Sequence, residues 1–341
     1  MKKLLHVGCL LGLILVTVLS GCGGGGGKST PPTPIVYAAG YYHNGGEIPF
    51  YWTSNDAETV TLSTTSGGAI YSIAYGNGQI YYGGYSKGGP CFWTGNTLTS
   101  LGTDGEVTSM VYANGNLYSG GYYYDGDGDL HACYWIGANN IPNALVEDSG
   151  RLYTIVFGNG AVYGGGYYYH DSGLNLPCYC KGNAPPVTLS TQEGYVYSSS
   201  FADGKVYLGG FYGSTPCYWT VDNTDNVEFF DLSPNSGQVK SIICANGTVY
   251  CGGYYDNDDG KDIPCYWTGA NNVPTRLPIP EGTTEARVES ITYANGTVYC
   301  GGYYSDGSKY YPCYWVGGAS NPVSLFPDGV NGGSVKAILV K

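Results

Sequence analysis

The chain has 341 residues, of which 57 are glycine, 37 are tyrosine and 12 are cysteine, and it carries 26 acidic against 14 basic side chains. The glycines follow no three-residue period, which excludes collagen, and a hydrophobic share of 43% excludes a disordered chain. Because the acidic excess repels phosphate groups, we expect no nucleic-acid partner.

The N-terminus carries an export signal. Lys2 and Lys3 precede an apolar run from Leu4 to Leu19, which is too short for a membrane span of roughly 20 residues. The run ends in Leu19-Ser20-Gly21-Cys22, which resembles the lipobox of bacterial lipoproteins. The resemblance implies that the signal peptide, residues 1–21, is removed and that Cys22 is acylated; an ordinary secretory signal is the alternative.

Acylation predicts that the protein is attached to a lipid bilayer through Cys22 without spanning it, because several acyl chains together hold a protein stably. Residues 22–34 are rich in glycine and proline and predict a tether between lipid and folded domain. We therefore expect the protein in the bacterial cell envelope, and at the outer membrane if the organism is Gram-negative.

A pattern of about 44 residues repeats seven times between residues 35 and 341. Six copies contain Asn-Gly or Asp-Gly between two alternating runs, which is the strongest short-range signal for a β-hairpin. Four short strands per copy, with almost no helical periodicity, predict an all-β fold, a seven-bladed β-propeller with four-stranded blades. Each copy also has a glycine pair or Ala-Gly before an aromatic residue, and these pairs end at Gly40, Gly84, Gly121, Gly166, Gly210, Gly253 and Gly302.

The two ends of the repeat region complement each other. Residues 35–41 begin at the second strand of a repeat, and Ser334 to Val340 matches a first strand without its hairpin. We predict that the C-terminal strand pairs with the N-terminal blade, which closes the ring and removes an open sheet edge. Residues 35–341 then form a single domain, which we expect to be monomeric.

The second run of each repeat resembles a known motif. Thr297-Val298-Tyr299-Cys300-Gly301-Gly302, with later Tyr and Trp, resembles the kelch repeat, and the likeness spans nearly all of residues 35–341. The adjacent aromatics of Tyr134-Trp135 depart from the kelch spacing and are more similar to bacterial envelope propellers of uncharacterised role that repeat a Cys-Tyr-Trp unit. Neither resemblance implies a catalytic residue.

Two aromatic positions recur and are predicted to fill the space between blades, since each buried ring removes roughly 150–250 Å² from water. The glycine pairs are predicted to allow close backbone approach between neighbouring sheets. The first aromatic position holds Tyr37, Tyr81, Tyr118, Tyr163, Tyr207, Tyr250 and Tyr299, and the second holds Trp52, Trp93, Trp135, Trp219, Trp267 and Trp315, with Cys180 in the fourth repeat.

A hydroxyl position recurs in the predicted innermost strands. It suits a crowded axial channel, where small hydroxyls satisfy their own polar groups. We align Lys336 with it in the remaining repeat, which makes Lys336 a candidate for holding a ligand or an anion in the channel. The position holds Ser72, Ser109, Thr154, Ser198, Ser241 and Ser290.

Six cysteines also occupy one repeated position. Ring symmetry keeps such residues apart, beyond the roughly 7 Å between α-carbons that a disulfide allows. Bridges within one blade, from Cys251 to Cys265 or from Cys300 to Cys313, are the alternative to small buried thiols. The repeated position holds Cys91, Cys133, Cys178, Cys217, Cys265 and Cys313.

The variable loops between second and third strands open on one face of a propeller, where binding usually resides. Asp125, Asp127 and Asp129 alternate as in the first half of a calcium loop, although Leu130 stands where that motif has glycine. Calcium is thus the one candidate cofactor, with solvated acidic turns as the alternative. Asp256, Asp258 and Asp262 form a second candidate set.

Tyrosines beside these loops are predicted ligand contacts, because tyrosine offers a large contact area at low entropic cost. Three histidines, His43, His131 and His170, lie in or beside the loops, in repeats too far apart to share a metal ion. The candidate ligand-binding residues are Tyr123, Tyr124, Tyr168, Tyr169, His170, Tyr255 and Tyr304, together with Lys336.

The sequence contains no Gly-x-Ser-x-Gly elbow and no carboxylate pair set apart from the repeat. We therefore expect no catalytic residue and a non-catalytic binding or scaffold protein, lipid-anchored in the bacterial cell envelope, that recognises a protein or glycan through one propeller face. A propeller-based polysaccharide lyase or hydrolase is the alternative, and a purely structural adhesion protein is a third.

Overall fold

The inner hairpin of each complete repeat forms where the sequence places Asn-Gly or Asp-Gly. In the computed structural model, which describes residues 33–62, 67–146, 150–327 and 329–341, Asn77 and Gly78 have φ angles of 48° and 76°. Two successive left-handed residues form the tight turn that matches the twist of paired strands. They join β4 (Gly68–Gly76) to β5 (Gln79–Ser86) in antiparallel register.

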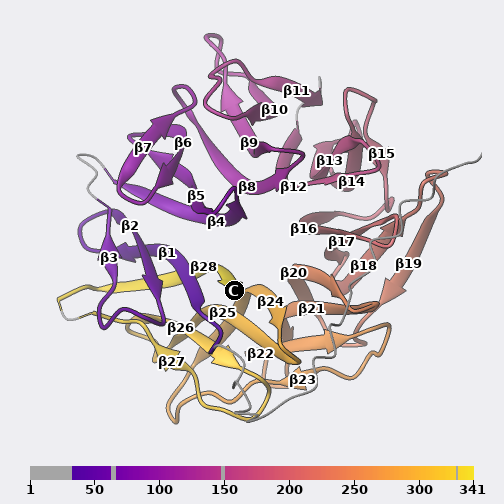
Figure 1. Cartoon of the computed structure of the whole chain (residues 1–341). Coiled ribbons are helices and arrows are strands. Elements are labelled where there is room, and N and C mark those ends of the chain that lie inside the picture. Colours follow the sequence, from indigo (N-terminus) through magenta and orange to yellow (C-terminus); the bar gives the residue numbers. More distant parts are fainter. Residues whose placement is uncertain (1–32, 63–66, 147–149, 328) are drawn as a thin grey trace, which may run out of the picture. The chain divides into compact units, whose positions relative to one another are not determined.

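Seven four-stranded antiparallel sheets surround a central axis (Figure 1), so the predicted seven-bladed β-propeller is confirmed. All of them lie within one compact unit, Pro34–Lys341. From the axis outward, blade 1 contains β28 (Gly332–Val340), β1 (Val36–His43), β2 (Glu47–Thr53) and β3 (Val60–Thr61), and blade 2 contains β4, β5, β6 (Gly89–Thr94) and β7 (Thr97–Ser100). In the same order, blade 3 contains β8 (Gly105–Ala113), β9 (Asn116–Tyr124), β10 (Leu130–Ile136) and β11 (Asn143–Val146); blade 4 contains β12 (Gly150–Gly158), β13 (Ala161–Tyr169), β14 (Asn175–Lys181) and β15 (Val187–Thr188); and blade 5 contains β16 (Gly194–Ala202), β17 (Lys205–Tyr212), β18 (Thr215–Val221) and β19 (Val227–Asp231). Blade 6 contains β20 (Gly237–Ala245), β21 (Thr248–Asp256), β22 (Asp262–Thr268) and β23 (Thr275–Arg276), and blade 7 contains β24 (Glu285–Ala294), β25 (Thr297–Ser305), β26 (Tyr310–Val316) and β27 (Val323–Ser324).

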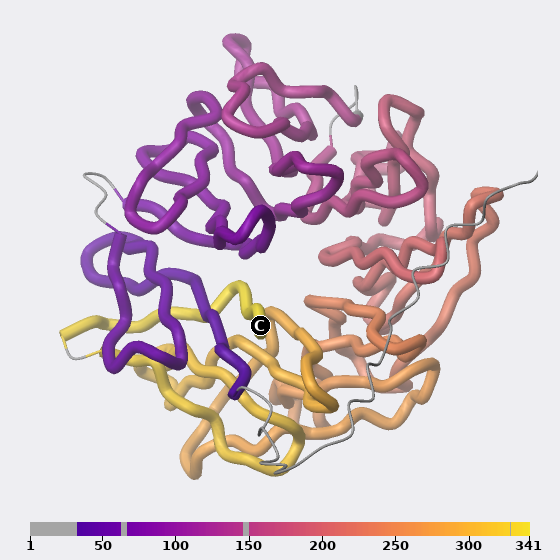
Figure 2. The backbone as a smooth tube through the Cα atoms, viewed as in Figure 1, coloured from indigo at the N-terminus to yellow at the C-terminus, as the bar shows by residue number. Residues whose placement is uncertain are grey.

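The ring closes through blade 1, as predicted. The C-terminal strand β28 pairs with β1 from Val36↔Val340 to His43↔Gly332, and Figure 2 shows the last segment of the chain lying beside the first. The backbone N–H groups of Ile35 and Lys341 each donate to the carbonyl oxygen of the other residue, at 2.8 and 2.9 Å. The innermost strand of this blade is therefore supplied from the far end of the chain.

The hydrophobic core lies between the blades. Five of the six repeated tryptophans are at most 1% exposed, and Trp52 is partly exposed. Trp135 of blade 3, for example, packs with Phe92 and Leu101 of blade 2. The repeated tyrosines are less uniform: Tyr163 is buried, whereas Tyr37 is partly exposed. Trp52 of blade 1 also packs between blades, with its ring centroid 5.4 Å from that of Tyr314 in blade 7. The predicted packing role is therefore confirmed for the tryptophans and for part of the tyrosines.

The glycine pair serves two different close contacts. A Cβ atom on Gly83 would lie 2.4 Å from the Sδ atom of Met110 in the next blade, as the prediction of close approach between sheets requires. A Cβ atom on Gly84 would lie 1.8 Å from the carbonyl oxygen of Ala69 in its own blade. The second glycine thus accommodates a β-bulge in the inner strand, between Ile70 and Ser72.

The ten cysteines in the described part of the chain are free thiols. Cys251 lies opposite Trp267 and Cys300 opposite Trp315, so each stands two residues away from the register that a bridge to Cys265 or Cys313 requires. The alternative of disulfides within a blade is therefore wrong. Nine of the ten thiols are buried, and Cys244 is partly exposed.

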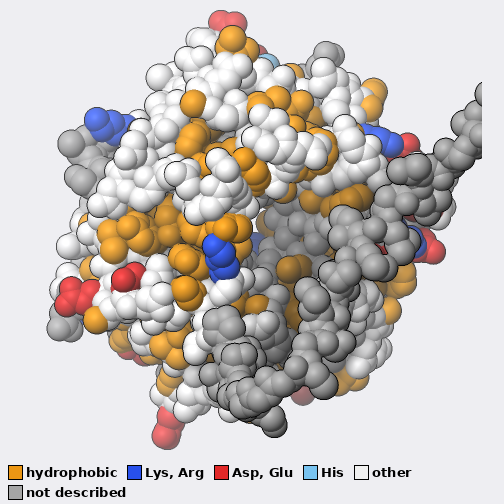
Figure 3. Space-filling view, viewed as in Figure 1, with side chains coloured by type: hydrophobic (Ala, Val, Ile, Leu, Met, Phe, Trp, Pro, Cys, Tyr) orange, Lys and Arg blue, Asp and Glu red, His pale blue; other side chains and the backbone are white. Residues whose placement is uncertain are grey.

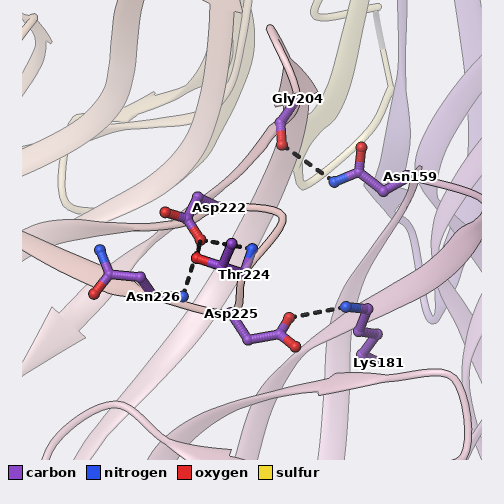
Figure 4. Close-up of polar contacts among 7 residues, drawn as sticks. All are labelled: Asn159, Lys181, Gly204, Asp222, Thr224, Asp225 and Asn226. Atoms are coloured by element: carbon purple, nitrogen blue, oxygen red, sulfur yellow. Dashed lines mark hydrogen bonds and ion pairs between the residues drawn. The ribbon is translucent and has the colours of Figure 1, made fainter.

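The two faces of the ring differ in their loops. The turn face carries the inner hairpin turns and the turns between third and fourth strands; the loop face carries the loops between second and third strands and the connections between blades. On the turn face, the Asn159 side chain of blade 4 donates to the Gly204 carbonyl oxygen of blade 5 at 3.1 Å, and Lys181 pairs with Asp225 at 2.9 Å (Figure 4). Side chains on this face therefore join neighbouring blades.

Charged side chains are sparse on the surface. Most of those on the visible side lie at its periphery, and a basic side chain lies beside the central opening (Figure 3). Within the described ranges no helix is long and apolar enough to span a bilayer. The expected signal peptide (1–21), acylated Cys22 and nearly all of the expected tether (22–34) lie outside the residues that the structure describes.

Candidate functional site

Every innermost strand contains a β-bulge, and the bulges place one residue per blade at the channel. Tyr71 is skipped in blade 2, where Ile70 pairs with Gly84 and Ser72 with Gly83. Bulges commonly redirect a side chain at functional sites. We call the skipped residues the bulge ring; they are Tyr71, Thr108, Tyr153, Tyr197, Lys240, Glu289 and Lys336.

The bulge corrects the sequence alignment of Lys336. In blade 1, Val335 pairs with Gly40 and Ala337 with Ala39, so Lys336 is the skipped residue and Ala337 occupies the hydroxyl position. The prediction that Lys336 lies at the channel is right, but its alignment with the serines is wrong by one residue. The inserted residue cannot be detected from alternation alone.

The hydroxyl position connects neighbouring blades. Ser72 Oγ accepts a hydrogen bond from the Met110 backbone N–H at 2.9 Å, and Ser290 Oγ accepts one from Ile338 N–H at 3.1 Å. Ser109 and Ser198 bind the next blade in the same way. These hydroxyls accept hydrogen bonds from backbone N–H groups of the neighbouring innermost strand, so they connect blades around the ring.

The bulge ring and the hydroxyl position line a cavity of about 160 Å³ on the axis, which we call the inner chamber. Lys336 Nζ lies 3.2 Å from Glu289 Oε2. Lys240 makes no ion pair with any described residue, and its Nζ lies 3.4 Å from the centroid of the Tyr197 ring. Three charged side chains therefore project into the inner chamber and include one ion pair.

The pKa values of these groups follow from burial and mutual attraction. Burial lowers the pKa of Lys240 to about 8, and the attraction of Glu289 only partly opposes this. Burial raises the pKa of Glu289, but Lys336 and Lys240 outweigh it and hold that pKa below its ordinary value. Burial lowers the pKa of Lys336, and Glu289 outweighs it. The Lys336–Glu289 pair is therefore ionised at neutral pH, and Lys240 is the poorly compensated charge.

A wider cavity of about 480 Å³, the outer chamber, shares Glu289 and Lys336 with the inner chamber. Its other charged side chains include Glu285 and Arg287. Arg287 contacts Asp262 and lies with its guanidinium carbon 4.5 Å from the Tyr254 ring centroid. Blades 6, 7 and 1 thus form a charged wall, defined by Lys240, Asp262, Glu285, Arg287, Glu289 and Lys336.

The opposite side of the channel mouth is aromatic. Tyr153 and Tyr167 of blade 4 contact the rings of blade 5, with the centroids of Tyr167 and Tyr195 5.0 Å apart. Tyr195 and Tyr197 stack at 5.9 Å, and both contact Phe211. We call these five residues the aromatic wall. The mouth of the channel is therefore asymmetric, although the backbone repeats in every blade.

A carboxylate pair lies beside the charged wall. Asp256 and Asp262 are directly opposite each other on β21 and β22. Burial, together with a hydrogen bond to Asp262, raises the pKa of Asp256 to about 6. The expectation that no carboxylate pair is set apart from the repeat is therefore wrong. Asp258, the third member of that candidate calcium set, lies exposed in the adjoining loop.

The first candidate calcium loop satisfies its own carboxylate. Asp125 Oδ1 accepts hydrogen bonds from the backbone N–H groups of Asp127 and Asp129 at 3.0 and 2.9 Å. Its Oδ2 contacts His131 Nε2 at 2.8 Å, and this contact holds the pKa of Asp125 below its ordinary value. Nowhere in the described ranges are three or more His, Cys, Asp or Glu side chains grouped to hold a metal ion. The geometry of this loop gives calcium binding no support.

The predicted tyrosines lie at the rim instead of the chambers. Tyr124 and Tyr169 are 44% and 56% exposed. Tyr123 stacks on His131, and Tyr304 stacks on Tyr311. The other three candidates are similarly separate: Tyr168 hydrogen-bonds Thr188, His170 contacts Ser172, and Tyr255 packs against the core of blade 6. Of the predicted ligand contacts, Lys336 alone lines a chamber, and the rim residues stay a prediction.

A larger cavity of about 710 Å³ lies between the outer parts of blades 7 and 1. Trp52 lines it, which explains why this tryptophan is only partly buried. Its charged lining consists of Asp56 and Glu58, both exposed. We therefore place the candidate site at the channel, where buried charges and aromatic rings converge.

Comparison with known proteins adds little. No family model matches the chain, and no curated protein matches it. A solved structure titled "Structure of YjhT" is 11% identical, with an alignment that covers 75% of this chain and 99% of that chain and a TM-score of 0.45. A likeness at that level supports no inference about the site, so the β-propeller assignment rests on the sheet topology of this chain.

Proposed function

We propose that this protein is a non-catalytic recognition protein of the bacterial cell envelope that binds a glycan in the mouth of its channel. The observation that carries the proposal is that tyrosine rings and charged side chains meet at two neighbouring chambers, which share Glu289 and Lys336. The tyrosines of the outer chamber are Tyr41, Tyr303 and Tyr310, and those of the aromatic wall that line the inner chamber are Tyr153 and Tyr197. Closing a ring requires neither wall, because the hydroxyl position and the tryptophans already join the blades. Buried charges cost folding energy and are retained most simply for binding.

The chemistry of the outer chamber, where Tyr41, Tyr303 and Tyr310 lie beside the charged groups, suits a sugar. Flat tyrosine rings offer an apolar face with a polar hydroxyl at one end, which matches the mixed surface of a pyranose. Carboxylates, ammonium groups and the Arg287 guanidinium offer hydrogen-bond partners for sugar hydroxyls. The outer chamber falls within the range of roughly 300–1,000 Å³ that is common for small-molecule pockets. A folded protein partner, in contrast, contacts about 800 Å² of surface and would rest mainly on the rim.

The glycan proposal is tested by binding measurements on Pro34–Lys341, the compact unit that contains all seven sheets. The unit is first applied to a glycan array, and hits are measured by titration calorimetry. Tyr303→Ala and Tyr310→Ala, both lining the outer chamber, are expected to weaken binding at least tenfold, because truncating an aromatic side chain at the centre of a binding site costs about 2 kcal/mol or more. Tyr169→Ala at the rim is the matched control and should change affinity less than twofold. Equal losses in rim and chamber variants would contradict the proposal.

Attachment to the envelope is a separate part of the proposal and rests on the Leu19-Ser20-Gly21-Cys22 sequence. Cells that express the full chain should incorporate labelled fatty acid into it, and the chain should fractionate with membranes. Cys22→Ala should abolish both. Labelling that persists in this variant would show that Cys22 is not the anchor.

The enzyme alternative is favoured by one observation, the Asp256–Asp262 pair. Glycosidases use two carboxyl groups, but they hold them about 5–9.5 Å apart so that a sugar atom or water lies between them. A directly hydrogen-bonded pair leaves no such space, which favours binding over cleavage. Turnover of a polysaccharide by Pro34–Lys341 that Asp256→Asn abolishes would replace the recognition function with a lytic one.

A further inference from the structure

We propose that the inner chamber is a binding site for one monovalent anionic group and that the glycan bound in the channel mouth is therefore an acidic one that inserts a carboxylate there. The second part of this inference rests on the proposed function, whereas the anion site itself does not.

The charge in the inner chamber is unbalanced. Lys240, Glu289 and Lys336 are the charged side chains among its lining residues, and together they carry a net charge of +1 when ionised. Glu289 is within ion-pair distance of Lys336, so the negative charge of Glu289 is already paired with that lysine. Among the described residues, Lys240 makes no ion pair; its Nζ lies over the ring face of Tyr197, and the attraction of Glu289 compensates its charge only in part. A single negative charge would neutralise the cluster, whereas a divalent anion would reverse its sign.

Tyrosine side chains add hydrogen-bond donors to the same chamber. Tyr71 and Tyr197 are both among its lining residues. Burial raises the pKa of both far above neutrality, so both remain protonated and able to donate. Together with the ammonium group of Lys240, these side chains provide three donor groups from blades 2, 5 and 6. Acceptor-only groups such as carboxylates are the natural partners of such a set.

The size of the chamber limits what enters it. Its volume of about 160 Å³ is the share of about five water molecules in the liquid. A carboxylate fits in that space with room for water, whereas a sugar residue fits the outer chamber of about 480 Å³. Because Lys336 and Glu289 line both chambers, a sugar ring in the outer chamber has its substituents beside the inner one. The geometry therefore separates ring recognition from charge recognition.

The charged wall elsewhere is already balanced. Arg287 contacts both Asp262 and Glu285, and Arg151, across the mouth, lies 3.7 Å from Glu106. The positive charge of each arginine is therefore offset by a neighbouring carboxylate, although the buried Nε of Arg151 makes no hydrogen bond to a described residue. Lys240 on β20 is thus the residue on which the anion site depends.

The experiment has two arms, both with Pro34–Lys341. In the first, acetate serves as a free monovalent carboxylate, and its effect on the melting temperature is compared between the wild type and Lys240→Met in identical buffers. Acetate should raise the melting temperature of the wild type more than that of Lys240→Met, because a ligand that binds only the folded state stabilises it. Lys205→Met, which removes the same charge from a solvent-exposed site beside the turn face, should respond like the wild type.

In the second arm, oligogalacturonate and its neutral methyl ester are titrated calorimetrically. The acid should bind at least tenfold tighter than the ester, and Lys240→Met should remove that difference while leaving the ester's affinity within twofold. Lys240→Gln serves as a second variant that retains a polar side chain, so that misfolding of one variant does not decide the result.

The outcomes separate the two claims. An acetate effect that depends on Lys240, without binding of either oligosaccharide, would support the anion site and count against the glycan. Equal affinity for acid and ester, with no Lys240-dependent acetate effect, would support the glycan and overturn the anion site. Failure in both arms would overturn both.

Discussion

Lys336 Nζ and Glu289 Oε2 lie 3.2 Å apart across the two innermost strands at which the ring closes, β28 of blade 1 and β24 of blade 7. The last strand of the chain therefore contributes to the candidate site as well as to closure. The third charge, Lys240 of blade 6, lies outside this pair. Replacing Lys336 and replacing Lys240 should consequently change the free energy of unfolding in opposite directions.

Lys336→Met should destabilise the fold, because it leaves the buried carboxylate of Glu289 without its partner; breaking such pairs costs roughly 3–5 kcal/mol, less whatever Lys240 compensates. Lys240→Met should stabilise the fold at pH 7 by up to about 3 kcal/mol, since it removes a charge whose folded pKa is depressed to about 8. Urea denaturation at pH 7 measures both. The same sign for both variants would contradict the assignment of Lys240 as the uncompensated charge.

The pKa of Lys240 also determines how the stabilisation by Lys240→Met depends on pH. Burial opposes protonation of Lys240 in the folded state but not in the unfolded state. The folded protein therefore loses stability as the pH falls through about 8, the folded pKa of Lys240. The stability difference between Lys240→Met and the wild type should therefore grow as the pH is lowered from 9.5 to 7. A difference that stays constant over this range would show that the Lys240 pKa is not perturbed.

The Asp256–Asp262 pair predicts a second pH effect with its own range. The folded pKa of Asp256 is raised to about 6, so its contribution to stability is present at pH 4 and is lost as the pH rises through 6. Asp256→Asn should match the wild type near pH 4 and exceed it at pH 7.5, by about 1 kcal/mol or less because the group is partly exposed. Melting curves across that range test this, and a wild type more stable than Asp256→Asn at pH 7.5 would refute it.

The fold could be predicted from the sequence because the same pattern of strands and turns recurs in seven repeats. Asn77-Gly78 and its equivalents fix the inner hairpins through their left-handed φ angles, and the incomplete repeats at the two ends predict closure. The site was harder to predict because it depends on departures from the repeat. One bulge in each inner strand adds a second channel-lining residue, such as Tyr71 beside Ser72, and strict alternation carries no signal for it.

The tyrosines beside the loops show a related limit. Successive residues of a strand point to opposite sides of the sheet. Tyr122 therefore lies under Arg151 of the next blade, whereas Tyr123 packs against the hydrophobic core between blades 2 and 3. The sequence singled out the second and third aromatics of such runs, but the structure brings the first one toward the mouth. A signal was available in the bulge position itself, where Lys240, Glu289 and Lys336 interrupt a series of hydroxyl-bearing residues.

The bulge also predicts a strict requirement for the second glycine of the pair. Gly84→Ala would force a Cβ atom against the Ala69 carbonyl oxygen, and relieving that contact requires the bulge to open. We expect a loss of several kcal/mol, in the range of severe backbone effects above about 3 kcal/mol. Gly126→Ala, where the added atom meets open space, is the control and should cost less than about 1 kcal/mol in the same denaturation measurement. Comparable losses in both variants would contradict the close contact.

The cysteine thiols of the folded protein should react slowly with a thiol reagent, because nearly all of them are buried. Burial raises the pKa of the buried cysteines, for example to about 12 at Cys180, whereas Cys244 is partly exposed. A thiol reagent at pH 8 should therefore label about one cysteine rapidly in native Pro34–Lys341 and ten after denaturation without reductant. Fewer than ten in the denatured protein would reveal a disulfide that the strand register excludes.

The most direct test of the account is a crystal structure of Pro34–Lys341 with an acidic oligosaccharide bound. The account predicts a sugar ring in the outer chamber, bordered by Arg287 and Lys336, with its carboxylate in the inner chamber within hydrogen-bond distance of Lys240. A ligand held at the rim near Tyr124 and Tyr169, with both chambers filled only by water, would contradict it.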